Sequence, residues 1–127
     1  MRIAGYAAIF DCVDHGGDIV RKGAFAKAAS TLPLLRQHDS RRRIGTVELA
    51  EEDARGLRII ASLSDGEIVR EGAGLSFGYR VRGARKGTYR EPTDLDLIEI
   101  SVVETPMQPL ARVLKTETNP KEILNGL

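Results

Sequence analysis

The sequence predicts a mainly β fold of the α+β class, a small antiparallel β-barrel of about six or seven strands with two or three short helices. Three observations lead to this prediction. Short apolar runs alternate with turn residues along the whole chain, the 127 residues amount to one domain, and no internal repeat or low-complexity linker divides them. Because aromatic residues make up only 5% of the chain, the core must consist mainly of Leu, Ile, Val and Ala.

Six apolar segments are the expected strands: residues 2–10, 33–38, 44–49, 56–63, 75–81 and 95–103. The third and fourth are separated by the polar residues 51–55, and we expect them to pair as a long hairpin. In the fifth, Leu75, Phe77, Tyr79 and Val81 should share one face, because successive side chains of a strand point to opposite sides.

Three short segments are expected to be helical. Residues 23–29 contain good helix formers, and residues 65–71 are followed by a terminating Gly72. Near the C-terminus, Asn119 is a suitable N-cap and Pro120 fits the first helical position.

Composition and charge exclude several classes of function. The net charge of +1 argues against strong binding to nucleic acid, and a single cysteine excludes an internal disulfide or a multi-cysteine metal site. No apolar run approaches the roughly 18 residues of a membrane span, and the N-terminus lacks a signal-peptide core. We expect a cytoplasmic protein with a barrel domain over residues 1–115 and a tail over residues 116–127 that can form a short helix.

Ser76 is the candidate nucleophile. It follows Gly74 and precedes Gly78 at period-two spacing, so its neighbours on the same strand face have no side chains. This pattern predicts a shallow clearing in which a substrate backbone could approach the hydroxyl. The alternative is that the glycines serve a bend in the strand and that the serine has no chemical role.

The candidate bases are the two histidines. His38 ends an apolar run and should be held more rigidly than His15, which lies in a Gly- and Asp-rich loop. Glu99 is a carboxylate in an otherwise apolar strand and could orient His38, whereas Asp39 is a rival because it adjoins His38 in sequence. Without a catalytic role, His38 would be a solvated loop histidine and Glu99 would lie on a solvated strand face.

Other constellations point to different chemistry. Asp11, Asp14, His15 and Asp18 could bind a cation, although their spacing lacks the calcium-loop pattern. The basic run 41–43 could contact nucleic acid or an acidic peptide, but so short a run is typical of a solvated turn. Nothing in the sequence around Cys12 marks an activated thiol, so its case as a nucleophile is weak.

Four stretches, taken in order, resemble the tailed-phage prohead (capsid maturation) serine protease family, which is related to the herpesvirus assemblins. They are residues 5–25, 34–45 with Leu34-Leu35-Arg36-Gln37-His38-Asp39, 74–79 with Gly74-Leu75-Ser76-Phe77-Gly78-Tyr79, and 97–106 with Leu97-Ile98-Glu99-Ile100-Ser101. The resemblance implies an assemblin-like barrel and a serine endopeptidase with Ser76 as nucleophile and His38 as base.

The same resemblance implies further roles. In the herpesvirus relatives a second histidine on a later strand is the third member, and the position of similar spacing here is Glu99. The oxyanion donors would be backbone amides of Met107 and Gln108. The family usually has Pro-Ala-Asn-Pro in that turn, whereas this chain has Pro106-Met107-Gln108-Pro109 and departs from the family at the two central residues.

The implied function is cleavage of the scaffolding segment of the major capsid protein, or of a separate scaffold protein, and of the enzyme itself. This would occur inside the immature prohead in the host cytoplasm. The resemblance implies no metal or organic cofactor, no nucleic-acid or membrane partner, and a homodimer or higher oligomer. Two alternatives stay open: a non-catalytic capsid-assembly barrel or scaffold-binding module, and a metal-dependent hydrolase built on the loop at residues 14–18.

Overall fold

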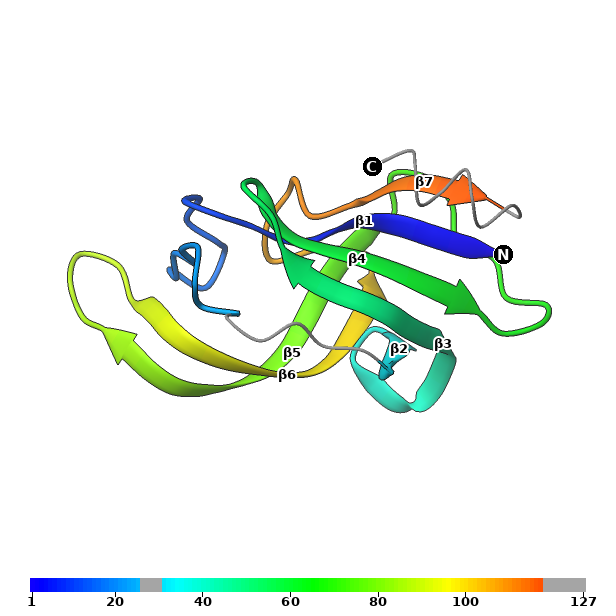
Figure 1. The fold of residues 1–127 in the computed structure, drawn as a ribbon, viewed down its shortest axis with the longest axis horizontal. Helices are drawn as coiled ribbons and strands as arrows, with labels where there is room; N and C mark the ends of the chain where they lie inside the picture. The colour runs from blue at the N-terminus through cyan, green and yellow to red at the C-terminus, as the bar shows by residue number, and fades with distance from the viewer. Residues whose placement is uncertain (26–30, 118–127) are drawn as a thin grey trace.

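The computed structural model of the chain describes residues 1–25 and 31–117, and seven strands run through them (Figure 1). They are β1 (Arg2–Ile9), β2 (Leu32–Arg36), β3 (Asp39–Glu52), β4 (Gly56–Leu63), β5 (Gly74–Arg85), β6 (Glu91–Val103) and β7 (Val113–Glu117). The predicted hairpin of residues 44–63 is confirmed as β3 and β4, which pair antiparallel.

The strands form one sheet in the order β5-β6-β2-β3-β4-β1-β7. Neighbouring strands are antiparallel except for β2 and β6, which pair in parallel. This sheet does not close into the barrel that the sequence predicted. Among the described residues, the bridge that joins the two sides is the antiparallel pair Gly74–Arg112. Beyond this bridge, β5 and β6 form a hairpin that projects beyond β1, β3 and β4 (Figure 1).

The core is aliphatic, as the composition predicted. The largest fully buried side chains include Ile3, Leu34, Leu57, Ile59, Leu75 and Ile100, which come from five strands. The predicted apolar face of β5 is correct for Leu75, Phe77 and Tyr79, which all pack on the core. It is wrong for Val81, which is 38% exposed. The β5–β6 register shifts after Gly78, and the strand continues into the projecting end of the hairpin.

No helix occurs in residues 1–25 or 31–117, so the prediction of short helices is wrong for the described part of the chain. Residues 65–71 form turns and irregular backbone, with Gly66 at a φ of 82° and Ile68 64% exposed. So short a segment cannot form a stable helix without an apolar face to bury. Residues 26–29 and 119–127 lie outside the described residues. In the described chain, no helix is long and apolar enough to cross a membrane.

A buried tyrosine ties β1 to the turn after β3. The hydroxyl of Tyr6 donates a hydrogen bond of 2.5 Å to Asp53 Oδ2. Burial and this hydrogen bond raise the pKa of Tyr6. Burial also acts to raise the pKa of Asp53, but hydrogen bonds from Tyr6 and from the backbone N–H groups of Arg55 and Gly56 outweigh it and hold that pKa below its usual value. The ionised carboxylate therefore stabilises the fold.

Candidate active site

His38 lies in a tight turn between β2 and β3. Arg36 pairs with Asp39, so Gln37 and His38 are the two central residues of the turn, with φ of 52° and 59°. Two successive residues with positive φ define the type I′ hairpin turn, which normally uses Asn-Gly. A non-glycine residue held there costs on the order of 1–3 kcal/mol and persists only when its surroundings fix it.

The backbone of this turn is fixed by β6. The N–H of Gln37 donates to the carbonyl of Val102 at 3.0 Å, and the N–H of His38 donates to Ser101 Oγ at 3.1 Å. In the other direction, the N–H of Glu104 donates to Gln37 Oε1 at 2.7 Å. The parallel pairing of β2 with β6 thus places His38 over the end of β6.

The imidazole of His38 faces a carboxylate on β6. His38 Nδ1 lies 2.5 Å from Glu99 Oε1, and the Glu99 side chain is 10% exposed. The second oxygen, Oε2, accepts a hydrogen bond of 2.6 Å from Ser101 Oγ. Because an ionised carboxylate can only accept hydrogen bonds, the proton of the neutral imidazole lies on Nδ1, and Nε2 is left as the acceptor.

Asp39, the rival carboxylate, is bonded elsewhere. Its Oδ1 accepts the backbone N–H of Arg41 at 2.9 Å and lies 3.2 Å from Arg41 Nε. These hydrogen bonds, the side-chain one first, lower the pKa of Asp39. Of the two carboxylates that the sequence offered, the structure brings Glu99 to the His38 ring.

Ser76 lies opposite Ser101 in the β5–β6 ladder. Directly opposed residues of an antiparallel pair have Cβ atoms about 5 Å apart on one face of the sheet. Glu99 is two residues from Ser101 on β6 and therefore shares this face. The two serines differ in bonding: Ser101 donates to Glu99, whereas the Ser76 hydroxyl makes no hydrogen bond to another described residue. Ser76 is the serine whose hydroxyl proton is uncommitted.

The predicted clearing around Ser76 is wrong. A Cβ at Gly74 would lie 2.8 Å from Pro106 Cδ, and one at Gly78 would lie 2.8 Å from Glu99 Cδ. A neighbouring side chain therefore occupies the space beside each glycine. Ser76 itself is only 5% exposed. The serine lies between the Pro106 ring and the Glu99 carboxylate.

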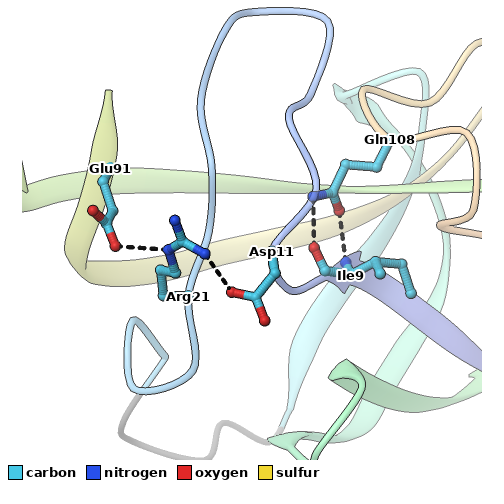
Figure 2. Close-up of polar contacts among 5 residues, drawn as sticks. All are labelled: Ile9, Asp11, Arg21, Glu91 and Gln108. Carbon is cyan, nitrogen blue, oxygen red and sulfur yellow. Dashed lines mark hydrogen bonds and ion pairs between the residues drawn. The ribbon is translucent and has the colours of Figure 1, made fainter. Parts of the chain in front are cut away.

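The turn after β6 is anchored by Gln108. Its side-chain amide pairs with the backbone of Ile9: Ile9 N–H donates to Oε1 at 2.7 Å, and Nε2 donates to the Ile9 carbonyl at 2.8 Å (Figure 2). The carbonyl of Met107 accepts the N–H of His15 at 2.9 Å. The backbone N–H groups of Met107 and Gln108 donate to no described residue, so both are available.

The acidic loop that suggested a cation site is neutralised by arginines and backbone. Asp11 contacts Arg21 at 2.9 Å (Figure 2), and Asp18 is paired with Arg90 at 2.6 Å. Asp14 Oδ1 accepts N–H groups within its own loop. No group of three or more possible ligands that could hold a metal ion occurs in the described part of the chain.

The basic run at residues 41–43 lies at the start of β3. Arg41 pairs with Asp39, and Arg43 donates to Gly45 and Thr46. A surface pocket of about 170 Å³ adjoins the His38 turn. Its lining residues are Arg36, Gln37, Arg42, Val102, Val103 and Glu104.

Sequence reasoning missed Ser101 as a member of the site. It named the residue only as a neighbour of Glu99, because a serine in an apolar strand is unremarkable by itself. Its position two residues after a carboxylate, on the same face of the strand, was the available signal.

Comparison with known proteins finds matches both to a family model and to solved structures. The family model described as Caudovirus prohead serine protease matches residues 1–124. A solved structure, KSHV protease in complex with a hexapeptide phosphonate inhibitor, matches with a TM-score of 0.57 and 9% sequence identity. That match covers 80% of this chain and 58% of the KSHV chain, and at this identity it shows a shared fold. No curated protein matches significantly. The family resemblance seen in the sequence is confirmed.

Proposed function

The chain belongs to the caudovirus prohead serine protease family, and we propose that its peptidase site consists of Ser76 as nucleophile, His38 as general base and Glu99 as the carboxylate that orients His38. The observation that carries this assignment is the 2.5 Å contact between His38 Nδ1 and Glu99 Oε1. A non-catalytic capsid-assembly protein predicts that Ser76, His38 and Glu99 do not converge. The contact argues against this for His38 and Glu99, and Ser76 lies opposite Ser101, which hydrogen-bonds both.

The proposed mechanism is acyl transfer. His38 Nε2 takes the proton of Ser76 as the hydroxyl oxygen attacks a peptide carbonyl, and the imidazolium is stabilised by Glu99. The imidazolium then protonates the leaving amine, and water resolves the acyl-enzyme ester. The backbone N–H groups of Met107 and Gln108 are the proposed oxyanion donors, which is supported by their lack of partners among the described residues.

The proposed substrates are the scaffolding segment of the major capsid protein or a separate scaffold protein, and the enzyme itself. Family membership supports a role in capsid maturation, which would place the enzyme inside the immature prohead. We further propose that it acts there as a homodimer or higher oligomer. Incubation with the capsid protein of the same genetic element should give a shortened capsid protein, whereas Ser76→Ala should leave it intact.

The decisive experiment is labelling with a serine-directed peptidyl phosphonate, read by intact mass. A single adduct on the wild type is expected, absent from Ser76→Ala and His38→Ala and present on Ser64→Ala, which alters an exposed serine outside the site. Labelling is repeated at high protein concentration and in crowding salts, because assembly could activate the enzyme. If the wild type gains no adduct under any of these conditions, a non-catalytic capsid-assembly or scaffold-binding role replaces this proposal.

A further inference from the structure

Ser101 connects the two residues proposed as base and orienting carboxylate. Its side chain is fully buried, it accepts the N–H of His38 at 3.1 Å, and it donates to Glu99 Oε2 at 2.6 Å. No other described side chain hydrogen-bonds both His38 and Glu99. A residue that served only to fill space in β6 would not need contacts to both.

The hydrogen-bond chemistry fixes the direction of each contact. A backbone N–H can only donate and an ionised carboxylate can only accept, so the single hydroxyl proton of Ser101 points at Glu99 while its oxygen receives His38 N–H. With Oε2 bound to Ser101, the Glu99 carboxylate is held in the orientation that presents Oε1 to the ring of His38.

The same oxygen also holds the strained backbone at His38. That residue has a φ of 59°, and the N–H that it directs at Ser101 is one of the contacts through which β6 fixes the turn. Removing the hydroxyl would leave this N–H without its acceptor and would leave a buried carboxylate with one hydrogen bond fewer. Both losses allow the ring and the carboxylate to move apart.

We propose that Ser101 is a positioning residue of the peptidase site, which acts by clamping the Glu99 carboxylate against the ring of His38 and the His38 backbone into its left-handed turn. The inference rests on the proposed function, because it assigns a role within that same site. Ser101 does not react with substrate, since its hydroxyl is fully buried and its proton is bound to Glu99.

The test combines proton NMR of the His38 ring with phosphonate labelling. A histidine N–H that donates to a carboxylate at 2.5 Å should give a far-downfield, slowly exchanging proton signal, which Glu99→Gln identifies by removing or shifting it. Ser101→Ala should lose this signal, and its labelling rate constant should fall about 10- to 100-fold, the effect of misplacing a catalytic group by about an ångström. Ser101→Thr, which restores a hydroxyl, should recover signal and labelling.

Two controls separate positioning from general stability. Ser62→Ala removes a strand hydroxyl elsewhere in the sheet and should retain both signal and labelling. If Ser101→Ala does not fold, Ser101→Cys gives the same test, because a thiol has a similar shape but is a weak donor and acceptor.

The proposal is overturned if a folded Ser101→Ala or Ser101→Cys variant keeps the downfield signal and labels within about twofold of the wild type, well short of the loss expected for misplacement. Failure of the proposed function looks different, because the wild type itself would then not label. The NMR signal is independent of labelling and would still show whether Ser101 holds Glu99 against His38.

Discussion

Gly78 is the residue whose substitution tests the site geometry most sharply. It lies opposite Glu99 in the β5–β6 ladder, and the Glu99 side chain crosses the space that a Cβ at this position would occupy. Gly78→Ala therefore adds one methyl group directly against the proposed orienting carboxylate. The substitution changes neither a charge nor any group proposed to react.

The displacement can be worked out from the contacts. The added Cβ would lie 2.8 Å from Glu99 Cδ and 2.9 Å from Cγ, and closer still to Oε1, whereas ordinary contact begins at 3.4 Å. The carboxyl carbon must therefore retreat by at least 0.6 Å (3.4 minus 2.8), and Oε1 by more. A retreat of this size directed away from the ring would lengthen the present 2.5 Å contact with His38 Nδ1 to about 3.1 Å, near the outer limit of a hydrogen bond.

We expect Gly78→Ala to lower the phosphonate labelling rate constant by about 10²-fold, which corresponds to about 2.7 kcal/mol of transition-state stabilisation. The matched control is Gly83→Ala on the same strand, where the nearest atom to a new Cβ is Thr93 Oγ1 at 3.0 Å, the end of an exposed side chain. Circular dichroism establishes that both variants fold. Equal labelling of Gly78→Ala, Gly83→Ala and the wild type would refute the role given to Glu99.

Three further outcomes are expected. Glu99→Gln should reduce the labelling rate constant about 10²- to 10⁴-fold and Asp39→Asn less than about threefold, because of these two carboxylates it is Glu99 that hydrogen-bonds the ring of His38. Asp53→Asn should destabilise the protein near pH 7, and in urea unfolding the difference should shrink as the pH falls below about 4, because a carboxylate of lowered pKa loses its contribution on protonation. Gln108→Ala should lower the unfolding free energy by about 2–4 kcal/mol in the same assay, because it leaves both buried backbone groups of Ile9 unpaired.

Strand positions could be predicted wherever a strand carries apolar side chains. The segments 56–63 and 2–10 match β4 and β1 to within a residue at each end. The segments 44–49 and 75–81 were too short, because β3 begins at Asp39 and β5 continues to Arg85 through exposed, largely polar residues. Such extensions are held by backbone hydrogen bonds, which leave no mark in the hydrophobic pattern.

The residues proposed for the site could be chosen from residue type and family resemblance, but their contacts could not. His38 was expected at the end of a strand, and it lies instead in a left-handed turn position that its sequence does not favour. Gly74 and Gly78 were expected to leave open space beside Ser76. The side chains of Pro106 and Glu99 fill that space, which residue spacing alone cannot show. Both errors concern contacts between segments far apart in the sequence.

The contacts that bring the proposed nucleophile, base and orienting carboxylate together all involve β6. It carries Glu99, it receives the His38 turn through its parallel pairing with β2, and it sets Ser101 opposite Ser76. Parallel pairing between β2 and β6 joins residues more than 60 positions apart, which no local pattern encodes. A substitution that shifts β6 by one residue would turn Glu99 to the opposite face of the sheet and separate it from His38. The register of β6 is thus the structural condition on which the proposed activity depends.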